Sequence, residues 1–194
     1  RNQTFSNNYE QSKFETEKML QGYREDLPIT IFRPSIVVGQ STNGFTPHFR
    51  VLYWPFKLMA TAPIPFVPCY RNAKLDVVPS DYVCRAIFAL MQSDKALGQT
   101  FHITAGRGNE TTVGGIVREF FRRGIVKWRP MIPFWSYSCI KYSFLRWIVP
   151  QDFWDVAKQA LPYRNYLTGT GVVYNNDKTL RLLRELGVEP PQWE

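Results

Sequence analysis

Tyr9 and Lys13 place a phenol and an ammonium group four residues apart in the run 7–20, which the sequence predicts to be helical. The run contains neither Pro nor Gly, and it begins with Asn residues, one of which is available as a helix cap. Residues at this spacing share one helix face, so both side chains can reach a single site. A cation beside a phenol favours the ionised form and eases proton transfer near neutral pH. Spacing alone also fits a half-buried Tyr beside a solvated Lys.

The residues after this helix predict a strand that would position the pair. The run 27–32 is short, apolar and rich in β-branched residues, which indicates a buried parallel strand. Pro34 breaks this strand, and a second apolar stretch continues to Gly39. In open α/β sheets, ligands bind just past the carboxyl ends of the strands. The bend at 34–36 is therefore a candidate cofactor wall.

These segments resemble the extended short-chain dehydrogenase/reductases. The active-site helix of that family and its following strand are similar to the Tyr9-x-x-x-Lys13 motif and the run 31–39. Residues 75–87 resemble the family's strand-Asp-helix element behind the substrate cleft. The run 33–41 is most similar to the fatty acyl-CoA reductase and thioester reductase branch, also named for male sterility proteins. Three ordered matches are far more specific than one.

The resemblance implies a fold, a cofactor and a reaction. The expected fold class is α/β, with the C-terminal part of a Rossmann-like doubly wound parallel sheet and a mostly helical substrate-binding lobe. The expected enzyme of lipid metabolism uses NADP, or NAD, to reduce a fatty acyl thioester on CoA or an acyl carrier to an aldehyde or alcohol. Tyr9 would protonate the developing oxyanion and Lys13 would hold the nicotinamide ribose. Pro34, Ser35 and Ile36 would pack against the nicotinamide.

Two other functions fit the same residues. A sugar-nucleotide epimerase or dehydratase of this fold would retain NAD and use Tyr9 as a base. A non-catalytic remnant of the scaffold would serve only in protein contacts. The family's glycine-rich phosphate turn has no counterpart before Tyr9, and the chain begins with Arg1. We therefore expect the C-terminal portion of a longer protein, incomplete as an enzyme by itself.

The alternation of composition along the chain predicts two lobes. Residues 1–38 and 75–104 hold the helices and strands expected to complete the dinucleotide-binding domain. Residues 39–74 and 105–194 are richer in Pro and aromatic residues, and they are expected to form the substrate-binding lobe.

Gly106 and Gly108 form a Gly-x-Gly turn that could be mistaken for a phosphate loop. There are only two glycines, and a charged residue lies between them where a phosphate would have to approach. We expect instead a loop that joins a strand at 99–103 to a helix capped by Thr111 or Thr112.

Aromatic residues are abundant, at 15% of the 194 residues, and many of them fall in the run 128–154. A lid packed on the sheet, a lining for a long acyl chain and an interfacial membrane helix all fit this run. Charged residues within it and prolines at both ends exclude a bilayer-spanning helix.

The net charge of +8 raises the question of a nucleic-acid partner. The basic residues are scattered apart from one local cluster, and no nucleic-acid motif accompanies it, so we expect no such partner. A solvated helix face fits this cluster, as does a surface for a phosphoanhydride, a carrier protein or a membrane. The cluster comprises Arg118, Arg122, Arg123, Lys127 and Arg129.

The three cysteines and two histidines are far apart in the sequence, which predicts neither a disulfide framework nor a metal site. Cys84 falls in an apolar run and is expected to be a buried thiol. A reducing cytoplasm fits this cysteine usage, with peripheral membrane attachment as a further option.

Overall fold

The computed structural model describes residues 5, 8–47, 53, 56–57, 60, 66–133 and 174–192. Most of the aromatic run 128–154 lies outside the described residues, so its three predicted roles stay predictions. Within the described ranges, no helix is both long and apolar enough to cross a bilayer.

The described residues form helices and short strands, as the sequence predicts for an α/β protein. They are α1 (Asn8–Gln21), β1 (Ile31–Pro34), β2 (Ile36–Val38), β3 (Val67–Pro68), β4 (Lys74–Leu75), β5 (Val77–Pro79), α3 (Ser80–Met91), a 3-10 turn (Asp94–Ala96), β6 (Thr100–Ile103), β7 (Thr111–Thr112), α4 (Val113–Arg122), β8 (Met131–Ile132) and α8 (Asp177–Glu185).

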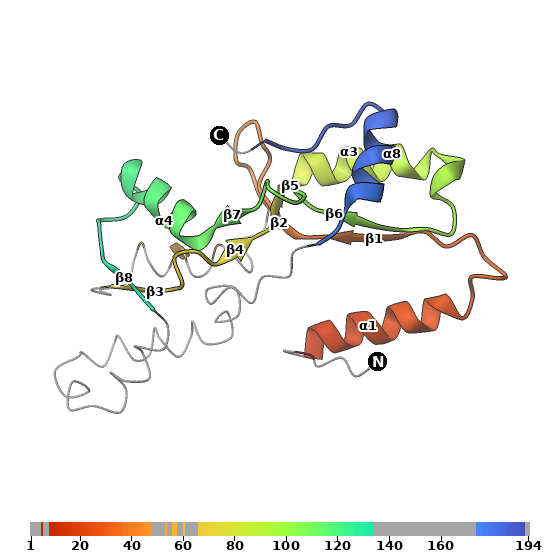
Figure 1. Ribbon diagram of the computed structural model, residues 1–194, viewed down its shortest axis with the longest axis horizontal. Coiled ribbons are helices and arrows are strands. Elements are labelled where there is room, and N and C mark those ends of the chain that lie inside the picture. Colours follow the sequence, from red (N-terminus) through yellow and green to blue (C-terminus); the bar gives the residue numbers. More distant parts are fainter. Residues whose placement is uncertain are drawn as a thin grey trace.

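The strands pair mainly in parallel. β1 pairs with β6, β2 with β5 and β3 with β8, all parallel, whereas β4 and β7 are antiparallel. Helices α3 and α8 lie on one side of the β1–β6 pair and α1 lies on the other (Figure 1). Helices on both faces of parallel strands are the arrangement of a doubly wound sheet. The predicted α/β fold class is confirmed.

The first strand differs from its prediction in position and burial. The run 27–32 was expected to be strand throughout, but β1 begins at Ile31, because Ile29 N–H closes a tight turn onto Leu27 O at 2.8 Å across Pro28. The expected burial is also wrong, since the residues of β1 are half-buried or exposed. Among the described residues, the buried side chains of the β1–β6 pair, Phe101 and Ile103, pack in a cluster with α3 and α8.

Local sequence determines the helix ends and faces. α1 spans Asn8–Gln21, within one residue of the predicted run 7–20, and none of its residues is buried. The predicted cap of α4 is Thr112, whose Oγ1 accepts a hydrogen bond from Gly115 N–H at 3.0 Å. Gly114 allows the start of α4 to approach the chain at Arg71, where a Cβ would overlap the Arg71 carbonyl at 2.6 Å.

Two hydrophobic clusters hold the described residues together. One lies between α3, β6 and α8 and includes Leu90, Phe101 and Leu183, all fully buried. The other packs α4 against β3, β4 and β5 and includes Leu75 and Val117. The α8 helix joins the first cluster although it comes from the end of the chain. The predicted division into a dinucleotide-binding domain and a substrate-binding lobe stays a prediction.

The expectation that Cys84 is buried is wrong, because its side chain is exposed. The buried face of α3 consists of Tyr82, Val83, Ala86 and Leu90, and Cys84 points away from it. Cys69 is buried, and burial raises the pKa of its thiol to about 11.

Candidate functional site

Tyr9 and Lys13 lie together on α1, as their spacing predicts. Lys13 Nζ is 5.5 Å from the centroid of the Tyr9 ring, a cation–π distance. The Tyr9 side chain is 69% exposed, so its hydroxyl is open to a ligand. α1 runs antiparallel to β1, and its first turn lies at the carboxyl end of that strand (Figure 1). The pair is thus at the end of the sheet where α/β proteins bind ligands.

A polar contact ties α1 to the sheet. Arg33 of β1 forms a two-point ion pair with Glu17, in which Arg33 Nε donates to Glu17 Oε2 at 2.9 Å. Glu17 is one turn beyond Lys13 and two turns beyond Tyr9, and therefore lies close to their helix face. Arg33 Nη1 also lies 3.3 Å from His102 Nε2, on the neighbouring strand β6. The bidentate geometry sets the orientation of the helix over the strands.

His102 and Tyr174 extend this contact into the interior. Their rings stack with centroids 5.5 Å apart and planes inclined by 26°. Burial, together with the Arg33 guanidinium, lowers the pKa of His102, so the imidazole is neutral at pH 7. Burial raises the pKa of Tyr174, and the carboxylates of Asp76 and Glu10 act in the same direction. Both rings are thus held uncharged beside the Arg33–Glu17 pair.

The predicted cofactor wall is the point where the chain changes strand partners. β1 pairs with β6 and β2 pairs with β5, and Ser35 lies between them. Ser35 N–H donates to Ile103 O at 3.0 Å, and Ile36 N–H donates to Asp76 O at 3.3 Å. The Ser35 hydroxyl is buried and has no hydrogen-bond partner among the described residues. An orphaned hydroxyl at this bend can bind a polar group of a ligand.

Two aspartates of the strand-Asp-helix element hold the loops around this bend. Asp76 Oδ1 accepts from Ala105 N–H at 2.9 Å, which fixes the loop after β6. Asp81 accepts from both the N–H and the hydroxyl of Ser41, each at 2.8 Å. The Ser41 N–H is the largest influence that lowers the pKa of Asp81. Gly39 completes the second loop, because a Cβ there would overlap the Gly44 carbonyl.

The sequence indicated only part of this site. It predicted Tyr9, Lys13, Pro34, Ser35 and Ile36, and the structure brings the last three into one bend at the sheet end that faces the first turn of α1. It missed the contact of Glu17 with Arg33 and the stacking of His102 on Tyr174. The available signal was the recurrence of polar residues at positions 9, 13 and 17 on one helix face.

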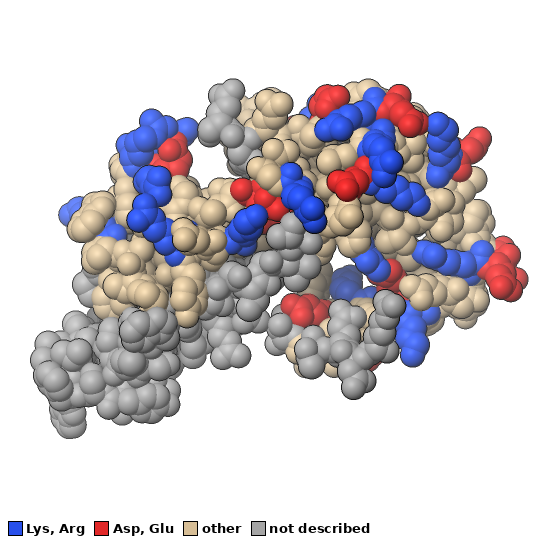
Figure 2. All heavy atoms as spheres, in the orientation of Figure 1, with Lys and Arg blue, Asp and Glu red and all other residues tan. Residues whose placement is uncertain are grey.

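The predicted basic cluster on α4 is partly neutralised by its own helix. Arg122 donates to Glu119 at 2.8 and 2.6 Å, and Arg123 donates to the same carboxylate at 2.5 Å. These hydrogen bonds lower the pKa of Glu119 to about 2. On the face drawn in Figure 2, acidic side chains are interspersed among the basic ones. Contact with a carrier protein or a membrane stays a prediction.

Parts of this chain are similar in sequence to known proteins. Residues 1–87 match an NAD-binding family described as Male sterility protein. A non-canonical nonribosomal peptide synthetase, cpsA of Aspergillus campestris, is 31% identical over 101 residues, which are 51% of this chain and 9% of that protein. The aldehyde reductase lnbA of Aspergillus flavus is 26% identical over 100 residues, 51% of this chain and 10% of that protein.

A solved structure has a similar fold. The terminal R domain from the myxalamid PKS-NRPS biosynthetic pathway superposes with a TM-score of 0.69 at 23% identity. The match covers 95% of this chain and 45% of that domain, so the chain spans less than half the length of this structure and about a tenth of each curated relative. The predicted resemblance to the thioester reductase branch, and the Rossmann-like fold it implied, are confirmed.

Proposed function

Because residues 1–87 carry the pattern of the NAD-binding male sterility family, we propose that this chain is part of an enzyme that reduces acyl thioesters with a nicotinamide cofactor. The observation that carries the proposal is the placement of Tyr9 and Lys13. The two groups are in contact, exposed, and at the carboxyl end of the strand that leads into the Ser35 bend. Such a pair is suited to donate a proton to an oxygen that gains negative charge.

The residues of this chain fit a nicotinamide nucleotide. Lys13 would donate hydrogen bonds to the ribose hydroxyls, and the exposed Pro34 with the half-buried Ile36 would pack against the ring. The orphaned Ser35 hydroxyl would bond to a polar group of the ring. When bound, a reduced nicotinamide supplies the hydride that adds to the carbonyl carbon. NADP is our choice of nucleotide, with NAD as the alternative.

Tyr9 acts as the acid in the proposed reaction. As the carbonyl carbon gains a hydride, its oxygen becomes an oxyanion, and the Tyr9 hydroxyl gives it a proton. The carbon–sulfur bond then breaks, and as the hydroxyl proton leaves the oxygen the departing sulfur takes up a proton, which releases the thiol and leaves an aldehyde. The Tyr9 oxygen, beside the Lys13 ammonium group, then regains a proton from water. Reduction of the aldehyde to an alcohol would repeat the same proton transfer.

The Glu17–Arg33–His102 contact positions the acid. It fixes the rotation of α1 at the turn next to Lys13 and therefore aims Tyr9 at the strand end. Positioning of this kind lowers the barrier without any contact with the reacting atoms. A carrier-bound acyl group is our preferred substrate, since one relative is a peptide synthetase, and an acyl-CoA is the alternative.

The proposal is tested by assaying the full-length protein with an acyl-pantetheine thioester and NADPH or NADH. We expect thioester-dependent oxidation of the reduced nucleotide, release of one thiol per aldehyde, and a preference for NADPH. A purified protein that retains its nucleotide and leaves thioesters unchanged would contradict the proposal and favour an epimerase-type reaction.

A further inference from the structure

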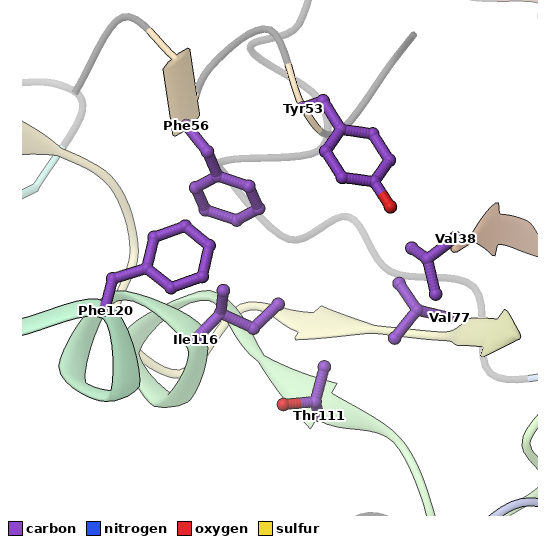
Figure 3. Close-up of a pocket in the computed structure, with 7 residues that line it drawn as sticks. All are labelled: Val38, Tyr53, Phe56, Val77, Thr111, Ile116 and Phe120. Atoms are coloured by element: carbon purple, nitrogen blue, oxygen red, sulfur yellow. The ribbon is translucent and has the colours of Figure 1, made fainter. Parts of the chain in front are cut away.

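A cavity of about 200 Å³ lies between α4, the last residue of β2 and the first residue of β5 (Figure 3). It is open on one side. Five of its lining side chains are pure hydrocarbon, and the other two bear a hydroxyl group. The lining residues are Val38, Tyr53, Phe56, Val77, Thr111, Ile116 and Phe120.

The polar atoms of the lining are directed away from the cavity or already bonded. Tyr53 Oη accepts a hydrogen bond from Gly39 N–H at 2.8 Å. Thr111 presents its methyl group toward the cavity, and its hydroxyl points toward α4 (Figure 3). The lining thus offers an apolar ligand surface to pack against and offers little to a charged one.

The walls are firmly supported. Phe56 and Phe120 meet edge to face with centroids 4.8 Å apart, and they close one end. Val77 and Phe56 are buried in the hydrophobic cluster under α4, whereas Ile116 and Phe120 are only partly buried and pack against it. A partly exposed apolar surface on a rigid support gains free energy when a ligand covers it.

The cavity is continuous with the proposed reduction site along the chain. Val38 ends β2, the strand that begins directly after Ser35. Tyr53 bonds to Gly39, the next residue, so the cavity wall and the proposed cofactor wall are parts of one strand and its loop. A group bound here would extend from the carboxyl end of the sheet toward α4.

We propose that this cavity binds the apolar end of the acyl group, and that it selects compact aromatic or branched groups. The inference rests on the proposed thioester reduction and specifies its substrate class. A cavity of about 150 Å³ with similar walls holds a benzene molecule. The larger volume here therefore accepts a phenyl ring with its methylene, whereas a palmitoyl chain exceeds it.

The experiment compares pantetheine thioesters on the full-length protein. The acyl groups are acetyl, phenylacetyl, succinyl and palmitoyl, and kcat/KM is measured for each with NADPH. We expect phenylacetyl to exceed acetyl by at least about tenfold, since each apolar carbon in such a pocket contributes that order of discrimination. Succinyl, which is charged, should be no better than acetyl, and palmitoyl should be poorer than phenylacetyl.

Ile116→Trp fills the cavity. Its matched control is Ile125→Trp, because Ile125 lies just beyond α4 and is 53% exposed. The first change should remove the advantage of phenylacetyl over acetyl, whereas the second, outside the cavity lining, should leave that advantage unchanged. If Ile116→Trp fails to fold, Ile116→Ala serves, and it should shift the preference toward naphthylacetyl. Equal kcat/KM for acetyl and phenylacetyl, or an unchanged preference in the Ile116 variants, would overturn the inference.

A binding measurement separates this inference from the proposed function. The phenylacetyl amide of pantetheine, which cannot be reduced, is titrated into the protein by calorimetry. Binding that Ile116→Trp weakens at least tenfold, in a protein that reduces no thioester, would overturn the proposed function and support the cavity. Turnover of thioesters without binding of the amide, or binding indifferent to Ile116→Trp, would overturn the cavity alone.

Discussion

Helices α1 and α3 lie on opposite sides of the same strands and are held in opposite ways. α3 buries Tyr82, Val83, Ala86 and Leu90 against β5, β6 and α8. α1 buries no residue, and its described contact with the strands runs through the Arg33–Glu17 ion pair. α3 is therefore part of the folded core, whereas α1 is held in orientation by charge.

Because of this difference in packing, α3 contributes to stability and α1 carries the candidate reactive groups. Core packing supplies most of the free energy of folding, so α3 can stabilise the sheet while it contributes no reactive group. An exposed helix contributes little to stability, and α1 can therefore present Tyr9 and Lys13 to a ligand without disturbing the core. Changes on the two helices should have opposite consequences for activity and for unfolding.

The largest expected effect is on activity. Tyr9→Phe in the full-length protein should lower kcat by about 10²–10⁴-fold, because a positioned proton donor contributes that much. The unfolding free energy should change by less than about 0.5 kcal/mol, since Tyr9 is 69% exposed. Steady-state kinetics and denaturant unfolding measure the two. Tyr23→Phe, at a residue 51% exposed just beyond α1, is the control, and equal losses in both variants would contradict a catalytic role.

The next effect is on stability alone. Leu90→Ala should destabilise the protein by about 2–5 kcal/mol, because Leu90 is fully buried in α3. Met19→Ala, at a residue 60% exposed on α1, should cost less than about 0.5 kcal/mol. Both are read from urea unfolding curves. Similar losses in the two variants would mean that α1 is packed as α3 is.

Breaking the ion pair should have an intermediate effect on catalysis. Glu17→Gln should lower kcat about tenfold with little change in the substrate KM. Without the ion pair, α1 is no longer held in one orientation, and the Tyr9 hydroxyl is no longer held at the strand end. The stability cost should stay below about 1 kcal/mol, since the Arg33 side chain is 43% exposed and such pairs contribute little.

Glu15→Gln, on the exposed face of α1, is the matched control for Glu17→Gln and should behave as the wild type. Glu17→Asp, which keeps the charge, should restore part of kcat. A wild-type kcat in Glu17→Gln would exclude the positioning role.

The smallest effect concerns the loop after β2. The pKa of Asp81 lies below its ordinary value of 3.8, chiefly because Ser41 N–H donates to it. A lowered pKa means that the ionised form stabilises the folded state, fully above the unfolded value and progressively less as pH falls through the folded one. The stability difference between wild type and Asp81→Asn should be constant above about pH 5 and shrink below about pH 4. Unfolding curves recorded across this pH range measure the stability difference. If it grew as the pH fell, the lowered pKa of Asp81 would be contradicted.

Features set by neighbouring residues were predictable from the sequence. The break at Pro34 and the Thr112 cap depend on a proline and a capping side chain within a few residues. The fold class followed from ordered motifs that resemble a known family, and the comparisons confirmed it. The role of Tyr9 and Lys13 is still a prediction, although the structure brings them into contact.

Features set by distant residues were not predictable. His102 reads as an isolated histidine, and only the parallel pairing of β6 with β1 places it beside Arg33. The exposure of Cys84 depends on which face of α3 meets β6, and the apolar run around it is too uniform to reveal that. The cavity is assembled from five segments, and no pattern in any one of them indicates it.

Isotope labelling tests directly whether a hydride passes from the nicotinamide to the thioester carbonyl. The full-length protein is given phenylacetyl-pantetheine and NADPH that carries deuterium at the transferable position of the nicotinamide, and the product is analysed by mass spectrometry. We expect one deuterium on the aldehyde carbon of the product, with loss of the labelled product in Tyr9→Phe but not in Tyr23→Phe. Unlabelled product, or labelled product at the wild-type rate from Tyr9→Phe, would contradict this expectation.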